Sequence, residues 1–134
     1  MIQLLSHLIG DYILQSHDMA TKKVNSSLWA LYHAFMYTLP FLFITQNPIK
    51  LSLICFSHFL IDRFRLAKYI TRYKNIIFGK CGESYGGLAV INDNEQYYTD
   101  TGYPKETPAW LSVWLLIITD NTLHLIINYL ILNN

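Results

Sequence analysis

The sequence predicts an all-α protein, a four-helix membrane bundle with a polar loop between its third and fourth helices. Hydrophobic residues make up 52% of the 134 residues and charged residues only 14%, whereas an ordinary soluble domain is about one quarter charged. The apolar residues are concentrated in four long stretches that polar segments separate. We therefore expect residues 1–134 to form a single membrane domain.

The first two helices are predicted from apolar runs on either side of a polar segment. The first, over residues 2–15, is short for a full membrane span, which needs about 20 residues. Ser26 and Ser27 are good N-cap residues for the second, over residues 28–45. Asn47 and Pro48 then interrupt the chain.

The third and fourth predicted helices differ in composition. The third, over residues 49–73, is apolar in its first half and rich in arginine and lysine in its second. Thr107 and Pro108 precede the fourth, over residues 109–132, which is the longest apolar run and the best candidate to span a bilayer.

Residues 79–108, between these two helices, are polar and contain many glycines, acids and tyrosines. The runs 88–91 and 96–99 flank four polar residues, a pattern that is consistent with a β-hairpin. Thirty residues are more than a plain connection needs, so we interpret this segment as a cytoplasmic loop or lid. A solvated surface insertion is the alternative.

The distribution of basic residues predicts the orientation in the membrane. If the first loop is cytoplasmic, nine of the ten lysines and arginines lie inside, as the positive-inside rule requires. Both termini would then lie outside the inner or plasma membrane of a bacterium. The net charge of +1 gives no reason to expect nucleic-acid binding.

Three aspartates each lie four residues from a histidine within the apolar stretches, a spacing that places both side chains on one face of a helix. A carboxylate in an apolar segment is unfavourable unless it is paired or bound to a cation. The remaining apolar stretch carries His33. The pattern therefore predicts a metal site with seven candidate ligands: His7, Asp11, His33, His58, Asp62, Asp120 and His124.

Imidazole and carboxylate groups are typical ligands of zinc, the favoured ion, and also suit manganese or iron. Seven ligands exceed one tetrahedral shell, so one or two divalent ions are open alternatives. An uncoordinated Asp62 or His33 would handle protons as the catalytic residue. The alternative to a metal is a set of local hydrogen bonds in which each histidine neutralises one acid.

Polar neighbours on the same helix faces are candidates to orient a ligand or contact a substrate. Gln15, Tyr37 and Asn121 are in this group, although ordinary packing would also explain them. A second group is basic, follows the third apolar stretch, and could attract an anionic substrate or simply anchor the chain on the inner side: Arg63, Arg65 and Lys68.

The order of these motifs resembles a family of small phage and bacterial membrane proteins of unknown function. The resemblance is carried by His7-x-x-x-Asp11-Tyr12-x-x-Gln15, His33-x-x-x-Tyr37, His58-Phe59-x-x-Asp62, Asp120-Asn121-Thr122-Leu123-His124 and Thr107-Pro108-x-Trp110. A related group of bacterial inner-membrane proteins is described as predicted membrane-bound metal-dependent hydrolases. The resemblance thus implies a hydrolytic metal site and a bacterial or phage-encoded protein.

Two functions remain open at this point. The favoured one is a membrane-embedded, metal-dependent hydrolase that acts from the cytoplasmic side on a phosphoester or lipid-linked substrate, with membrane lipid as its surroundings. The alternative is a non-enzymatic phage membrane protein whose structural metal or polar network supports binding to a host membrane protein. An oligomer is compatible with both, and a transporter is less so because four helices are few for alternating access.

Overall fold

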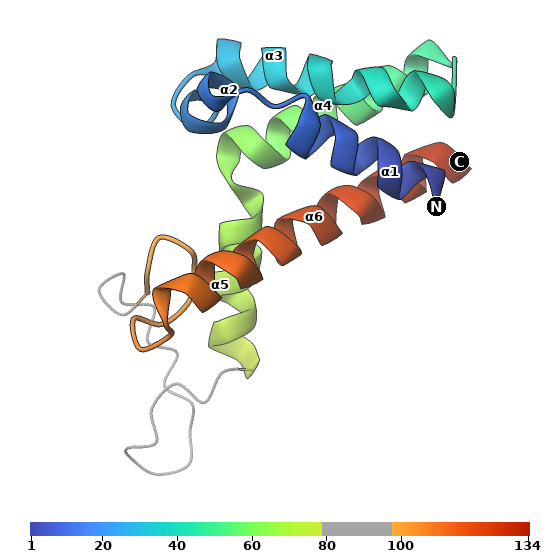
Figure 1. Ribbon diagram of the computed structural model, residues 1–134. Coiled ribbons are helices and arrows are strands. Elements are labelled where there is room, and N and C mark those ends of the chain that lie inside the picture. Colours follow the sequence, from blue (N-terminus) through green and yellow to red (C-terminus); the bar gives the residue numbers. More distant parts are fainter. Residues whose placement is uncertain (79–97) are drawn as a thin grey trace. The chain divides into compact units, whose positions relative to one another are not determined.

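The computed structural model describes residues 1–78 and 98–134, in which all regular secondary structure is helical (Figure 1). The predicted all-α class is therefore confirmed. The α-helices are α1 (Ile2–Leu8), α2 (His17–Lys22), α3 (Ser27–Thr38), α4 (Pro48–Phe64), α5 (Leu66–Phe78) and α6 (Ala109–Asn133). The predicted β-hairpin lies outside the described residues except for its last two positions, and so does most of the loop over residues 79–108.

The first two predicted helices are present, but neither is α-helical throughout. A π-helical turn over Ile9–Ile13 continues α1, and the amide of Leu14 donates to the carbonyl of Ile9 at 2.9 Å, five residues back. A 3-10 turn over Leu39–Phe43 continues α3. The change coincides with Pro40, which has no amide hydrogen to donate to the preceding turn.

The prediction of one continuous third helix over residues 49–73 is wrong. Arg65 adopts a left-handed backbone conformation with φ of 51°, and this ends α4 before α5 begins. The start of α4 is well defined because Asn47 caps it, accepting a hydrogen bond from the Ile49 amide at 2.9 Å. The sequence reasoning also missed α2, which the Ser16 side chain caps by accepting from the Met19 amide at 3.3 Å.

The described residues divide into two compact units. The first unit comprises Met1–Arg65 and Asn121–Asn134, and the second unit comprises Leu66–Asp120. In the first unit α3 packs against α4 and against the π turn, and the fully buried Tyr37, Phe41 and Ile54 form the apolar core.

In the second unit, the segment that precedes α6 is bound to α5 by polar contacts. Lys68 donates to Asp100 at 2.8 Å, and the Thr71 hydroxyl donates to the Thr101 carbonyl at 2.7 Å. Gly102 has φ of 81° and lies directly against the backbone of α5. A Cβ at this position would overlap the Thr71 hydroxyl. Only glycine fits this turn without strain.

Among the described residues, α6 is the one helix that is long and apolar enough to cross a membrane. The described residues therefore do not form the predicted bundle of four membrane-spanning helices. The physical reason is that the chain leaves α-helical geometry early: α1 has 7 residues, α3 has 12 and α4 has 17. All three are shorter than the roughly 20 residues of a typical span.

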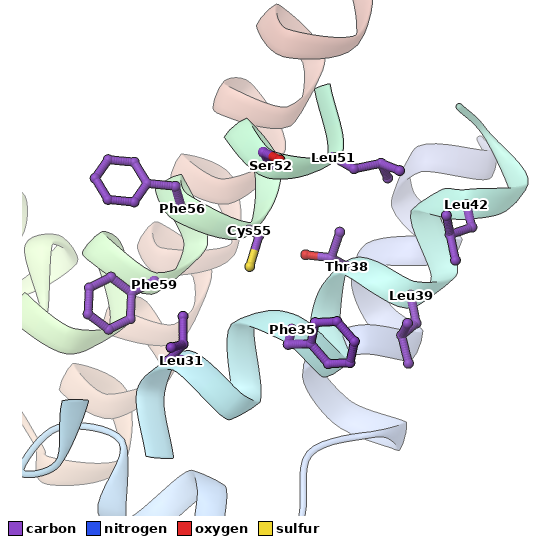
Figure 2. A pocket seen from close by; sticks show the side chains of 10 residues that line it. All are labelled: Leu31, Phe35, Thr38, Leu39, Leu42, Leu51, Ser52, Cys55, Phe56 and Phe59. Atoms are coloured by element: carbon purple, nitrogen blue, oxygen red, sulfur yellow. The ribbon is translucent and has the colours of Figure 1, made fainter. Parts of the chain in front are cut away.

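A cavity of about 500 Å³ lies between α3, the 3-10 turn and α4 in the first unit (Figure 2). Aromatic and aliphatic side chains form most of its wall, including Phe35, Phe56 and Phe59. No lining residue carries a formal charge, so the cavity suits hydrocarbon better than a charged group.

Candidate metal centre

Six ionisable side chains are buried inside the first unit. The histidines are at most 1% exposed and the aspartates at most 8%: His7, His33, His58, His124, Asp11 and Asp62. They come from α1 and its π turn, α3, α4 and α6. Carboxylates so far removed from water are unfavourable unless a positive charge compensates them.

Four of these side chains bring one possible ligand atom each to within 4.8 Å of the other three, and we call the space between these atoms the centre: Asp11, His33, His58 and Asp62. The His33 and His58 Nε2 atoms are 3.0 Å apart. His33 Nε2 lies 3.2 Å from both Asp11 Oδ1 and Asp62 Oδ2. His58 Nε2 lies 3.3 Å from Asp11 Oδ1 and 3.1 Å from Asp62 Oδ2.

These separations, 3.0–3.3 Å, are close to or slightly shorter than the spacing of ligands around a single metal ion. A tetrahedral ion with ligands at about 2.0–2.1 Å has ligand atoms about 3.3–3.4 Å from one another. Ordinary hydrogen bonding explains the geometry less well, since one Nε2 hydrogen on His58 cannot serve His33, Asp11 and Asp62 together. The described donor set could therefore hold a metal ion.

Local structure explains how three of the four donors reach the centre. His58 and Asp62 are one turn apart on α4, so helical periodicity places them on the same face. The Tyr37 ring stacks on the His58 ring at 3.6 Å between centroids and restricts its rotation. Asp11 lies in the π turn, which packs closely on α3 through Gly10.

His7 lies beside this centre, and both of its ring nitrogens have other partners. Nδ1 is 2.8 Å from the Tyr37 hydroxyl, and Nε2 donates to Asn121 Oδ1 at 2.7 Å. Nδ1 is also 3.5 Å from Asp11 Oδ2, the carboxylate oxygen that does not face the centre. Because Nε2 carries the ring hydrogen in this arrangement, Nδ1 accepts from the Tyr37 hydroxyl. Tyr37 and Asn121 therefore fix the orientation of His7 beside Asp11.

His124 connects α6 to the same group. Its Nδ1 lies 3.2 Å from Nδ1 of His58, the nitrogen that faces away from the centre. Its Nε2 lies 3.5 Å from Asp62 Oδ1. Asp120, the seventh predicted ligand, is one turn before His124 in α6 and belongs to the second unit.

Sequence reasoning missed two residues of the site. Asn128 donates to the Tyr37 hydroxyl at 2.6 Å, and its place one turn after His124 in an apolar helix was an available signal. Lys23 donates to Asp62 Oδ2 at 2.8 Å. No local pattern marks Lys23, because the contact joins residues 39 positions apart.

Gln15, which the sequence predicted as a neighbour of the site, contacts both Asp11 and Lys23. With its amide oriented to satisfy both groups, it donates to the Asp11 carbonyl at 3.0 Å and accepts from Lys23 at 2.8 Å. The basic residues predicted to attract an anion have other contacts. Arg63 donates to Ser27 at 3.1 Å and to the Val24 carbonyl, and so joins the end of α4 to the start of α3.

Fold and site together define an all-α protein with a buried histidine–aspartate cluster that could hold a metal ion. The chain belongs to the family described as "Protein of unknown function (DUF3307)", whose sequence profile matches residues 1–82. That range includes Asp11, His33, His58 and Asp62. No curated protein and no solved structure matched the chain.

Proposed function

We propose that this protein is a membrane-associated, metal-dependent hydrolase with one catalytic ion. The observation that supports the proposal most directly is the convergence of two imidazole nitrogens and two carboxylate oxygens, with five of their six separations at 3.0–3.3 Å. Zinc is the favoured ion because its ligand distances fit these separations, and manganese and iron also bind such ligands.

The distribution of polarity in the first unit supports a location in the membrane. Its ionisable cluster is buried, whereas large apolar side chains are exposed, among them Leu31 (53%), Phe35 (57%) and Phe56 (60%). Apolar surface outside and polar groups inside are favourable when lipid is the solvent. We propose that α6 crosses the inner membrane of a bacterium, that both termini lie outside and that residues 79–108 lie in the cytoplasm.

A divalent ion in the centre would lower the pKa of a water molecule and polarise a phosphoryl or carbonyl oxygen. The surrounding residues would hold the ligands in place: the Tyr37 ring stacks on His58, and His124 contacts both His58 and Asp62. If Asp62 binds through Oδ2, its Oδ1 is still able to accept a proton from an attacking water. The predicted substrates are phosphoesters or lipid-linked compounds, and the apolar cavity between α3 and α4 could accommodate the hydrocarbon part of such a compound.

Elemental analysis of the detergent-purified protein tests the metal centre. We expect about one zinc, manganese or iron ion per chain, and loss of that ion in His58→Ala and Asp62→Asn. His17→Ala is the matched control, because His17 is the exposed histidine outside the cluster. A wild-type protein that stays metal-free after incubation with each ion would overturn the proposal.

The alternative, a non-enzymatic membrane protein with a structural metal or polar network, is favoured by one observation. Asn128, Tyr37 and His7 form a continuous buried chain of hydrogen bonds that joins α6, α3 and α1. Such a network could simply hold a small bundle together while the protein binds a host membrane protein. A screen of phosphoester and acyl substrates separates the two functions, since only the hydrolase would lose a measured turnover when Asp62→Asn removes the ion.

A further inference from the structure

We propose that Lys23 binds the phosphoryl group of an anionic substrate at the metal centre. This inference rests on the proposed function and makes it more specific, because it names the chemical class of the substrate. It starts from the position of Lys23, which the pattern of histidines and aspartates does not include.

The backbone of Lys23 is held by α2. Its amide donates to the Met19 carbonyl at 3.0 Å, and Met19 is 3% exposed. From there the ammonium group reaches Asp62, and the lysine side chain is 19% exposed whereas that of Asp62 is 4% exposed. The neighbouring Lys22 points elsewhere, to Asp18 at 2.8 Å, and its side chain is 50% exposed.

Lys23 and the candidate metal ion would compete for the same oxygen. Asp62 Oδ2 lies 2.8 Å from Lys23 Nζ and also faces His33 Nε2 and His58 Nε2 at 3.2 and 3.1 Å. A divalent ion bound to this oxygen would stand next to the ammonium group. Two positive charges so close together in a poorly solvated site repel each other unless an anion lies between them.

The charges of the buried Asp11 and Asp62 and of the partly exposed Lys23 point to the same conclusion. Asp11 and Asp62 contribute two negative charges, and Lys23 contributes one positive charge. A divalent ion would bring the sum of these groups to +1, which favours an anionic ligand. A phosphoryl oxygen can contact the ion and the ammonium group together, as lysine commonly contacts phosphate.

Gln15 is placed to keep the ammonium group at the centre when Asp62 binds an ion. Its side-chain oxygen accepts from Lys23 Nζ at 2.8 Å, while its amide donates to the Asp11 carbonyl at 3.0 Å. Gln15 and Lys23 are also partly exposed, unlike the four candidate ligands. A substrate could therefore approach the centre on this side.

Cobalt substitution tests the proposal with the full-length protein in detergent. Titration of the cobalt-loaded protein with inorganic phosphate should change the visible spectrum of the ion, and Lys23→Met should weaken phosphate binding by about tenfold or more. The cobalt content of Lys23→Met should equal that of the wild type. Lys22→Met is the matched control and should bind phosphate like the wild type, while Lys23→Arg should restore part of the affinity. Gln15→Leu, which keeps the lysine, should have a smaller effect.

The outcomes distinguish failure of the role of Lys23 from failure of the metal centre. Unchanged phosphate affinity in a cobalt-loaded Lys23→Met protein overturns the role of Lys23 and leaves the metal centre standing. Loss of cobalt in both Lys23→Met and Lys23→Arg also overturns it, because the lysine would then be structural. Failure of the wild type to bind cobalt or the ions named above overturns both proposals. Competition by phosphatidic acid and by glycerol phosphate then separates a lipid phosphate from a soluble one.

Discussion

Gly10→Ala should weaken the metal centre without altering any residue that faces it. Gly10 lies in the π turn, where the chain packs on the backbone of α3. A Cβ at this position would be 2.6 Å from Tyr37 Cδ2 and 2.9 Å from the Tyr37 carbonyl oxygen, whereas ordinary contacts begin at 3.4 Å. The side chain of Tyr37 can adjust only slightly because its ring is stacked on His58.

The expected displacement follows from these distances. To restore ordinary contact, the new Cβ must move about 0.5 Å further from the Tyr37 carbonyl oxygen and about 0.8 Å further from Tyr37 Cδ2. The π turn and α3 must therefore separate by about 0.5–0.8 Å, whereas metal–ligand distances tolerate only about 0.2 Å. Asp11 Oδ1 would move away from His33 Nε2, and metal affinity should fall by about tenfold to a hundredfold. The free energy of unfolding should fall by about 1 kcal/mol, because overpacking costs about 1–3 kcal/mol and alanine returns about 1 kcal/mol of helix propensity.

Two measurements in detergent check this prediction. Competition with a chromophoric chelator gives the metal affinity, and thermal unfolding with and without metal gives the stability. Ile13→Ala is the matched control, since Ile13 lies in the same π turn and is 72% exposed. A Gly10→Ala protein that matches this control in metal affinity would refute the argument that close packing of the π turn positions Asp11.

Two further predictions concern stability. Gly102→Ala should destabilise the second unit by about 1–3 kcal/mol, because φ of 81° disfavours a side chain and the new Cβ would overlap Thr71. Faster amide hydrogen exchange in α5 would show this loss of stability, and unchanged exchange would contradict it. Tyr37→Phe should lower the free energy of unfolding by about 1–3 kcal/mol, since it removes the hydroxyl shared by His7 and Asn128 but keeps the ring. Thermal unfolding of this variant at the wild-type temperature would rule out a stabilising role for the hydrogen bonds of Tyr37.

Helical periodicity was sufficient to predict the parts of the site that lie within one helix. His58 and Asp62 are four residues apart in α4, and the structure places their donor atoms 3.1 Å apart. The apolar runs likewise predicted α6 to within one residue at its C-terminal end. These features depend on contacts between near neighbours in the chain, which the sequence displays directly.

The breaks in the helices depend on tertiary packing, and the sequence did not reveal them. The π turn at Gly10 fits the surface of α3, and the left-handed Arg65 divides what appeared to be one helix. Neither position carries a strong local signal. Arginine in particular has no intrinsic preference for left-handed geometry.

By itself, the sequence determined that this protein is helical and that histidines and aspartates share its apolar faces. Only the tertiary structure decided which of them converge, because that depends on how α1, α3 and α4 pack against one another. It selected Asp11, His33, His58 and Asp62 as the central group and placed His7 and His124 around them. It also brought Lys23 to Asp62 across 39 residues, a long-range contact that no local pattern could predict.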